Sequence, residues 1–143
     1  MEIKKALVYN PIKSTVYKGE LFYMDIIVAG CGKIGMVLIE SLLSEGHDIT
    51  AVDISQAVIE KATTTFDVRG VTGSAAAYET LAEADADKAD IFIAVTDSDE
   101  LNMISCFFAR KLGAKHTVAR IRKAEYNDKE KSFIRENMEL SMV

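Results

Sequence analysis

Cysteine, histidine and proline are scarce in this 143-residue sequence, which has two, two and one of them, and no apolar run approaches the length of a membrane span. Cys31 and Cys106 alone cannot supply the four thiolates of a cysteine-only metal site, and so few cysteines suit a reducing compartment. The apolar stretches are far shorter than the roughly 20 residues that cross a bilayer as a helix. The formal net charge of −5 argues against a broad nucleic-acid-binding surface.

The remaining composition is that of an ordinary globular chain, with 49% hydrophobic and 27% charged residues, and the length fits one domain. Residues 1–23 carry several lysines and no long apolar core, so they make a poor secretory signal. We interpret residues 1–23 as an N-terminal extension or a cloning remnant, with an added edge hairpin used in dimerisation as the alternative. Met24 is a plausible natural start, and residues 24–143 are expected to form the domain.

The stretch around which the chain is organised runs from residue 25 to residue 43. An apolar run of strand length over 25–29 leads into Gly-x-Gly-x-x-Gly, and the apolar periodicity over 36–43 predicts a helix. Gly30 allows a tight turn, Gly32 lets a phosphate approach the backbone, and Gly35 lets the helix pack closely on the strand. Because a helix N-terminus presents free N–H groups and the positive end of its dipole, the sequence predicts an anion site here.

An acidic residue follows near the spacing that ribose recognition requires. Residues 49–53 form a second apolar strand that ends in Asp53, close to the distance of about 20 residues at which a carboxylate binds a ribose 2′-hydroxyl. Strand, glycine turn, helix, strand and acid therefore fit within one βαβ unit. The simpler alternatives are a βαβ unit that binds nothing and an Asp53 that is only a surface acid.

Strands and helices alternate along the rest of the chain, which predicts an α/β fold: a Rossmann-type doubly wound parallel sheet in a single three-layer α/β/α domain. Further strands are expected at 67–71, 91–95 and 116–121. Helices are expected after Ser55, over 75–84, from about residue 99 to Gly113, and over 129–136, with a final apolar segment beginning at 140. The helix that ends at Gly113 is expected to bury Ile104, Phe107, Phe108 and Leu112.

Several polar residues have two interpretations. Asp97, Asp99 and Glu100 are interpreted as a solvated helix N-terminus rather than a metal site, although an ATP-bound state could recruit magnesium or calcium. Arg120 and Arg122 are expected to face opposite sides of the predicted strand. We assign Arg120 to the ligand side, with a surface ion pair as the alternative.

Other reactive side chains are given structural roles. Cys31 could be a reactive thiol at a helix N-terminus, but a small residue that fits the turn is favoured. Lys33 is either a partner for phosphate or a solvated cation. His47 and His116 fall on the N-terminal edge of the predicted sheet, away from the edge where ligands bind, so both are expected to be structural or exposed.

These motifs carry a family resemblance over residues 24–143. Ile-Val-Ala-Gly-Cys-Gly-Lys-Ile-Gly at 27–35 and Asp-Ile-Thr-Ala-Val-Asp at 48–53 occur in many dinucleotide folds, whereas Val-Thr-Asp-Ser-Asp-Glu-Leu-Asn-Met at 95–103 and Ala-Arg-Ile-Arg-Lys-Ala-Glu-Tyr at 119–126 are more specific. The chain resembles the N-terminal RCK (also called KTN) nucleotide-binding domain of TrkA-like regulatory subunits of Trk potassium-uptake systems. The second, ligand-sensing domain of that family is not expected within this sequence.

The resemblance implies a non-enzymatic cytoplasmic subunit, peripheral on the inner face of the cell membrane, that regulates a membrane potassium translocator. It implies binding of NAD(H), or of ATP, ADP or AMP, and a homodimer within a larger ring. It also implies a nucleotide site with the pyrophosphate at the glycine turn, the adenosine ribose at Asp53, the adenine beside 72–74 and the distal ribose near 96–100. Its residues would be Gly30, Cys31, Gly32, Lys33, Ile34, Gly35, Asp53, Ile54, Thr72, Gly73, Ser74, Val95, Thr96, Asp97, Glu100 and Arg120.

Two other functions fit the same motifs. The chain could be the cofactor-binding domain of an NAD-dependent oxidoreductase, although little of it remains to build the second domain that carries an acid/base group. It could also be a methyltransferase-like binder of adenosine compounds. The sensor is the preferred interpretation.

Overall fold

The computed structural model describes residues 23–141, and these form a parallel five-stranded sheet covered by helices on both faces. The expectations for residues 1–22, including the extension and the edge hairpin, lie outside the described residues, as do the last two residues of the final apolar segment. The predicted doubly wound α/β fold is confirmed.

All four strand pairs are parallel, and the strands lie in the order β3-β2-β1-β4-β5. The strands are β1 (Asp25–Ala29), β2 (Asp48–Asp53), β3 (Arg69–Thr72), β4 (Ile91–Ala94) and β5 (His116–Ala119). The helices are α2 (Lys33–Ser44), α3 (Gln56–Thr65), α4 (Tyr78–Glu83), the short 3₁₀ helix η1 (Ala86–Lys88), α5 (Asp99–Leu112) and α6 (Asp128–Asn137). The strand order reverses between β1 and β4, which is where open α/β sheets bind ligands.

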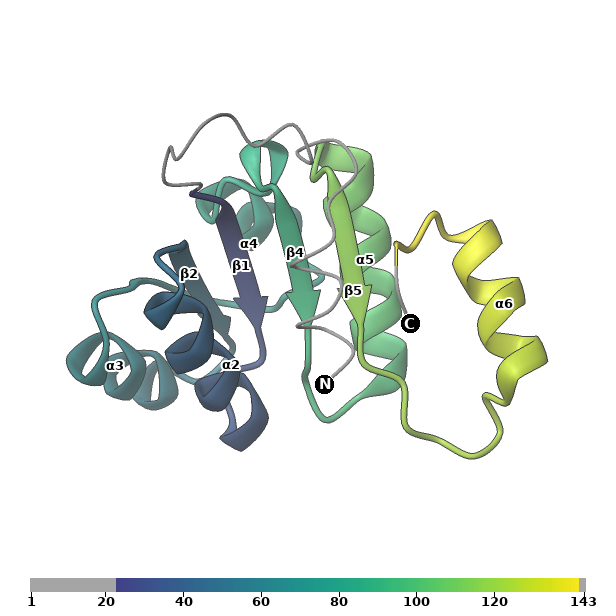
Figure 1. Ribbon diagram of the computed structural model, residues 1–143, viewed down its shortest axis with the longest axis horizontal. Helices are drawn as coiled ribbons and strands as arrows, with labels where there is room; N and C mark the ends of the chain where they lie inside the picture. The colour runs from purple at the N-terminus through teal and green to yellow at the C-terminus, as the bar shows by residue number, and fades with distance from the viewer. Residues whose placement is uncertain (1–22, 142–143) are drawn as a thin grey trace.

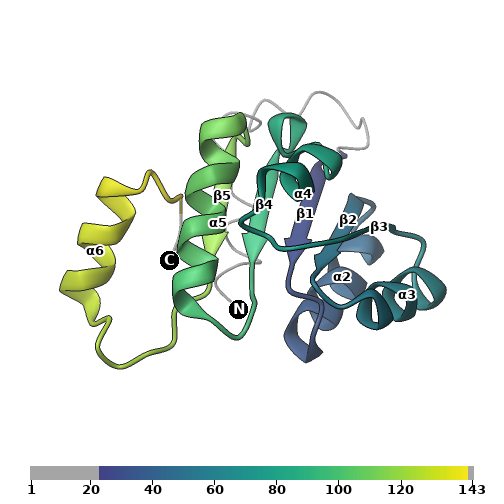
Figure 2. The same ribbon diagram turned by 180° about the vertical axis from the view of Figure 1, so that it is seen from behind.

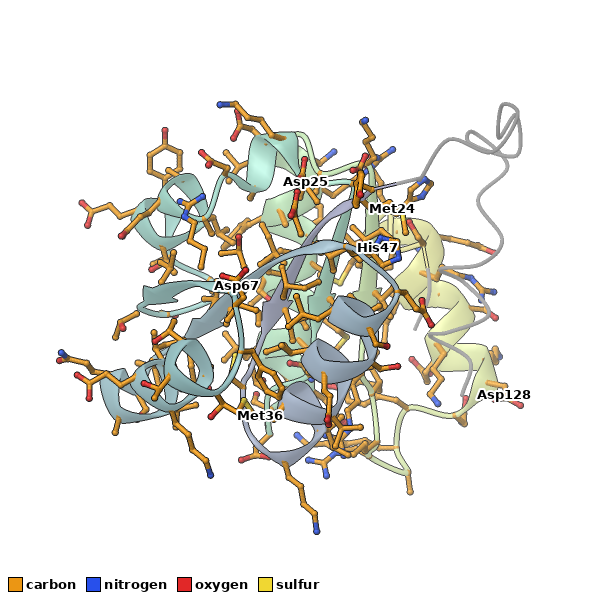
Figure 3. All side chains as sticks on the ribbon, turned by 60° about the vertical axis from the view of Figure 1, so that its left-hand side comes forward. Met24, Asp25, Met36, His47, Asp67 and Asp128 are labelled. Atoms are coloured by element: carbon orange, nitrogen blue, oxygen red, sulfur yellow. The ribbon has the colours of Figure 1, made fainter. Side chains whose placement is uncertain are left out.

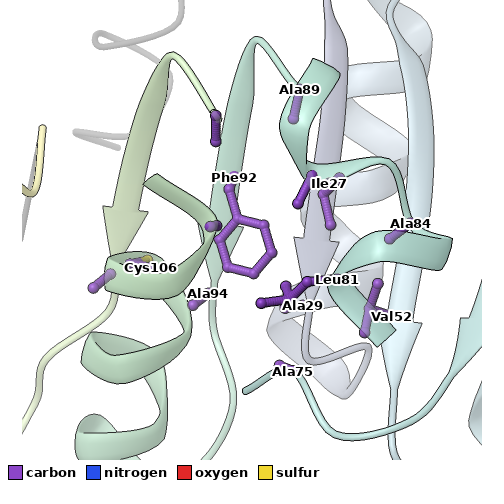
Figure 4. Packing of buried hydrophobic residues seen from close by; sticks show 14 of the residues in the cluster. Ile27, Ala29, Val52, Ala75, Leu81, Ala84, Ala89, Phe92, Ala94 and Cys106 are labelled. Atoms are coloured by element: carbon purple, nitrogen blue, oxygen red, sulfur yellow. The ribbon is translucent and has the colours of Figure 1, made fainter. Parts of the chain in front are cut away.

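The sheet separates two hydrophobic clusters. One contains the inward side chains of α2 and α3, and the other contains those of α4, α5 and α6. Figures 1 and 2 show α2 and α3 on one side of the sheet and α4 and α5 on the other, with α6 beyond the β5 edge. Phe92 of β4 is fully buried and lies between α4 and α5 in the second cluster (Figure 4).

The boundaries that differ by two or more residues from the expected strands and the short helix before η1 are the following. β3 begins at Arg69 rather than at residue 67, α4 begins at Tyr78 rather than at residue 75, and β5 ends at Ala119 rather than at residue 121. The first two shifts are small. The third changes the site, because the chain after Ala119 no longer follows the alternation of a strand.

The buried face of α5 also differs from the expectation. Phe108 is 39% exposed, and Ile104, Phe107 and Leu112 are only partly buried. The fully buried positions include Asn102 and Ser105, at 0% exposure. Of the four expected residues, Leu112 packs against the second hydrophobic cluster, whereas Phe108 is exposed, so the large apolar residues were a poor guide to the inward face of this helix.

Both histidines lie at the N-terminal edge of the sheet, as expected. His47 immediately precedes β2, and its Nδ1 accepts a hydrogen bond from the Met24 backbone N–H at 3.3 Å. Figure 3 shows His47 beside Met24, at the end of the molecule opposite Met36 of α2. His116 is the first residue of β5.

Candidate functional site

A cleft of about 620 Å³ opens at the carboxyl edge of the sheet, at the point where the strand order reverses. The strand arrows in Figure 1 point toward this edge, where the loops leading to α2 and α5 begin. The volume is within the range of small-molecule sites. The cleft is lined by Gly30, Gly32, Lys33, Ile34, Val52, Asp53, Ile54, Val58, Gly73, Ser74, Ala75, Val95, Thr96, Asp97, Ser98, Leu101, Arg120 and Arg122.

The three glycines of the turn have different surroundings. Gly30 has a φ of +97°, and a Cβ there would lie 2.7 Å from the Thr96 backbone nitrogen. A Cβ on Gly35 would lie 1.9 Å from the Gly30 carbonyl oxygen, so α2 packs against the turn with no room for a side chain. At Gly32, by contrast, a Cβ would meet no heavy atom of the described residues within 4 Å. The fold requires glycine at 30 and 35 but gives no steric reason for glycine at 32.

The N-terminus of α2 faces the cleft without a side-chain cap. Ser55, Ser98 and Asn127 each accept a hydrogen bond from the first turn of α3, α5 and α6. Gly32 is the N-cap residue of α2 and has no side chain to do the same, and the first turn of α2 contains no acidic residue. Since an uncapped helix N-terminus attracts anions, this end of α2 can receive a phosphate.

Asp53 lines the cleft at the end of β2 and also holds its neighbouring turns. Its Oδ2 accepts a hydrogen bond from the Cys31 backbone N–H at 2.9 Å, and its Oδ1 accepts one from the Ser55 backbone N–H at 2.9 Å. Each carboxylate oxygen retains acceptor capacity, because an ionised carboxylate offers about four lone-pair sites. Asp53 can therefore accept hydroxyl hydrogen bonds from a ligand without releasing the glycine turn.

Three cationic side chains line the cleft: Lys33, Arg120 and Arg122. The expectation from sequence missed Arg122 because it placed the two arginines on opposite faces, although side chains two residues apart on a strand point to the same face. The strand ends at Ala119, and both arginines reach the same cleft. The Arg122 Nη2 donates to the Asp97 carbonyl oxygen at 3.4 Å. Among the described residues, neither Lys33 nor Arg120 has an ion-pair partner, so both remain available to an anion.

Four of the expected site residues do not line the cleft. Gly35 is buried against Gly30, Thr72 is exposed at the end of β3, and Glu100 lies outside the lining residues. Cys31 is 2% exposed, and its thiol lies 3.5 Å from the Val52 carbonyl oxygen, to which it can donate. Burial and the nearby Asp53 carboxylate raise the pKa of the Cys31 thiol to about 12, which supports the favoured interpretation of Cys31 as a small residue that fits the turn.

Glu100 and Asp99 lie close in sequence but in different environments. Glu100 forms an ion pair with Lys123 and accepts a hydrogen bond from the Tyr126 hydroxyl at 3.1 Å. The hydrogen bond from Lys123 lowers the pKa of the Glu100 carboxyl below its usual value. Asp99 is only 2% exposed, so the expectation that this acidic cluster is a solvated helix N-terminus is wrong at that position.

The structure adds lining residues that the sequence did not single out. They are Val52, Val58, Ala75, Ser98, Leu101 and Arg122. The apolar members lie at strand ends and helix starts beside the predicted motifs. Their closeness in sequence to those motifs was the one signal that could have identified them as lining residues. Within residues 23–141, no group of three or more His, Cys, Asp or Glu side chains is placed to hold a metal ion, and no helix is long and apolar enough to span a bilayer.

Comparison with known families matches the TrkA-N domain model to residues 26–136. The chain belongs to the TrkA-N domain family. The Trk system potassium uptake protein TrkA of Haemophilus influenzae is 41% identical over 117 residues, covering 80% of this TrkA-N chain and 26% of that protein. A TrkA homolog of Methanothermobacter thermautotrophicus is 30% identical over 105 residues, covering 73% of this chain and 49% of that protein. The chain thus spans between about a quarter and a half of these relatives.

Solved structures share the fold of this TrkA-N domain. The TrkA-N domain of inner membrane protein ybaL from Escherichia coli has a TM-score of 0.73 at 22% identity, covering 83% of this chain and 84% of that one. The GsuK channel bound to NAD has a TM-score of 0.65 at 22% identity, and the match covers 90% of this chain and 23% of the channel chain. The Kef CTD of Shewanella denitrificans in its AMP-bound form has a TM-score of 0.65 at 21% identity, and the match covers 83% of this chain and 70% of that one.

Proposed function

We propose that this TrkA-N domain is the nucleotide-sensing part of a regulatory subunit of a potassium uptake system. It binds NAD(H), or ATP, ADP or AMP, in the cleft at the carboxyl edge of the sheet, and occupancy gates a membrane potassium translocator. It acts at the cytoplasmic face of the membrane through that partner, as a homodimer within a larger ring. The Trk names of its relatives and the nucleotides bound by GsuK and Kef support this proposal.

The observation that carries the proposal is the space above Gly32. Glycine at a helix N-cap is less favourable than serine, aspartate or asparagine, and the fold itself has room for a side chain there. A ligand that must reach the backbone N–H groups of α2 accounts for the missing side chain. Lys33, Arg120 and Arg122 line the same cleft and supply positive charge for a diphosphate.

Each part of a dinucleotide has a counterpart in the lining residues. Asp53 takes the adenosine ribose, with Ile54 and the Gly73–Ser74 turn beside the adenine. The diphosphate lies over Gly32, Lys33 and Ile34. Thr96, Asp97 and the two arginines take the distal half of the ligand. AMP, ADP and ATP would use the same ribose and phosphate positions.

Gating by such a domain is a matter of differential affinity. A nucleotide biases the translocator only as far as it binds one conformation of the assembly more tightly than the other. Each tenfold difference in affinity contributes about 1.4 kcal/mol. A regulatory domain of this kind needs no chemical step.

The oxidoreductase alternative would need an acid/base group beside the nicotinamide. Among the described residues that line the cleft there is no histidine, and His47 and His116 lie at the opposite edge of the sheet. The methyltransferase-like alternative would prefer S-adenosylmethionine to a dinucleotide. The cationic lining favours a phosphorylated ligand.

A substitution at Gly32 tests the proposal because its effects on stability and on binding should have opposite signs. Gly32→Asp adds an acidic N-cap to α2, which should stabilise the fold by up to about 1 kcal/mol. The same carboxylate would occupy and repel the phosphate position, so NAD affinity should fall at least about a hundredfold. Ala77→Asp is the matched control, since Ala77 is the uncapped N-cap residue of α4 and does not line the cleft.

The measurements are thermal unfolding and calorimetric titration with NAD, NADH, AMP, ADP, ATP and S-adenosylmethionine. Undiminished NAD binding by a folded Gly32→Asp variant would contradict the proposed phosphate position. Failure of the unmodified chain to bind any of these compounds would contradict the sensor function. Turnover of NAD with small alcohols or hydroxy acids would support the oxidoreductase instead.

A further inference from the structure

The two arginines of the cleft lie where the chain leaves the sheet, just after the end of β5. The Arg120 backbone N–H donates to the Ala94 carbonyl oxygen at 2.9 Å, which is the last such bond between this part of the chain and β4. Residues 120–123 have no regular secondary structure. From the Arg120 carbonyl onward, contacts from outside the sheet must therefore fix the path of the chain that carries Arg122 and the direction in which the segment continues along the cleft.

Asn102 of α5 supplies the first of these contacts. Its side chain is fully buried, and its Oδ1 accepts hydrogen bonds from the Thr96 backbone N–H at 2.8 Å and the Thr96 hydroxyl at 2.6 Å. Its Nδ2 donates to the Thr96 carbonyl oxygen at 3.2 Å and the Arg120 carbonyl oxygen at 2.8 Å. Because a backbone N–H can only donate, the oxygen of the amide must face Thr96, and the orientation of Asn102 is fixed.

Asp99 supplies the second contact, one helical turn earlier on the same face of α5. Its Oδ2 accepts hydrogen bonds from the backbone N–H groups of Arg122 at 3.0 Å and Lys123 at 2.8 Å. Asn102 and Asp99 thus hold the irregular segment at both of its cleft-facing residues. Asn102 also joins that segment to Thr96, which lines the cleft from the loop after β4.

Burying these two polar side chains is costly unless their hydrogen bonds are complete. An apolar residue at either position would pack against the sheet without that requirement, but it would leave the backbone groups of Thr96, Arg120 and Arg122 without these partners. The pair therefore does something that packing alone does not: it sets the path of the segment that carries both arginines.

We propose that Asn102 and Asp99 are positioning residues that hold Arg120 and Arg122 toward the phosphates of a bound nucleotide, a role that rests on the nucleotide-binding function proposed above. They contact the backbone of the arginine segment and not the ligand. Removing either contact should therefore weaken phosphate recognition and spare recognition of the adenosine, which falls to Asp53 and its neighbours.

A double-mutant cycle tests this role. Calorimetric titration with NAD, and with adenosine as a probe without phosphate, would be run on the unmodified chain, Asn102→Ala, the Arg120→Ala/Arg122→Ala variant, and the triple variant. We expect Asn102→Ala to weaken NAD binding about tenfold or more and to change adenosine binding less than about twofold. In the background that lacks both arginines, the same substitution should change NAD affinity less than about twofold.

The matched control is Ser105→Ala. Ser105 is equally buried on α5, but its hydroxyl donates only to the Asn102 carbonyl oxygen of its own helix, so NAD affinity should not change. If Asn102→Ala does not fold by circular dichroism, Asp99→Leu keeps a side chain of similar shape without any hydrogen-bond acceptor and tests the second contact in the same cycle.

An equal loss of NAD affinity with and without the arginines, or an equal loss for adenosine, would overturn the positioning role while leaving nucleotide binding intact. Absence of NAD and adenosine binding by the unmodified chain would instead overturn the proposed function and the positioning role together.

Discussion

The Oδ2 atom of Asp53 lies 2.9 Å from the backbone nitrogen of Cys31 and accepts its hydrogen bond. This contact joins the end of β2 to the glycine turn between β1 and α2. Asp53 therefore supports the fold and also lines the cleft. Its substitution should change both the stability of the protein and the affinity for a ligand in the cleft.

Asp53→Ala should lower stability and ligand affinity together. Loss of the acceptor leaves the buried Cys31 N–H without its partner, which should reduce the free energy of unfolding by about 1–3 kcal/mol. Loss of the charged ribose partner should weaken NAD binding by a similar amount. Denaturant unfolding and calorimetry would measure the two effects. Asp48→Ala, an exposed acid at the other end of β2, is the control, and unchanged NAD affinity in a folded Asp53→Ala variant would remove Asp53 from the site.

NAD(H) should bind more tightly than NADP(H). The Asp53 carboxylate at the end of β2 would repel and crowd a ribose 2′-phosphate. Competition titrations on the unmodified chain would give the ratio of the two affinities, and Asp53→Ala should narrow that ratio. Equal affinities in the unmodified chain would count against ribose recognition by Asp53.

The thiols should be unreactive in the folded protein. The pKa of Cys31 is raised to about 12 by burial and Asp53, and burial also raises the pKa of Cys106. At pH 8 the thiolate fraction of Cys31 should be roughly a thousandfold below that of a thiol with the ordinary value of 9.0. A colorimetric thiol reagent should react with both thiols in denaturant and with neither in native protein on the same timescale. Any slow reaction of the native protein should become faster as the pH rises. Rapid modification of Cys31 under native conditions would contradict its placement beneath the turn.

The domain should form a homodimer through β5 and α6. Phe133 on α6 is 62% exposed and would be covered in such an assembly. Sedimentation at increasing protein concentration would detect the dimer, and Phe133→Asp should shift it toward monomer without loss of helix content. An exclusively monomeric chain at high concentration would disprove the expectation.

Local patterns were sufficient to predict the fold and the centre of the cleft. The glycine turn, the apolar strands and Asp53 are signals within short stretches of sequence, and each lies where its pattern indicated. Twelve of the sixteen expected site residues line the cleft. The helix starts at Ser55, Ser98 and Asn127 are likewise marked by local capping residues.

Non-local contacts account for what the sequence did not reveal. Ile121 and Arg122 suit a strand, yet β5 ends earlier because Asp99 and Asn102 capture the backbone that follows it. Nothing in the periodicity of α5 distinguishes a buried carboxylate at Asp99 from a solvated one at Glu100. The partners of Asp99 lie more than twenty residues away in the sequence, and only the folded chain brings them together.

The room above Gly32 has an evolutionary consequence. In a library selected for heat resistance alone, this glycine should be among the first to drift toward serine or aspartate, while Gly30 and Gly35 persist. If the proposed function is correct, variants selected in this way without nucleotide would lose nucleotide affinity as they gain thermal stability. Glycine at position 32, unlike glycine at positions 30 and 35, is thus a residue that the fold itself does not require.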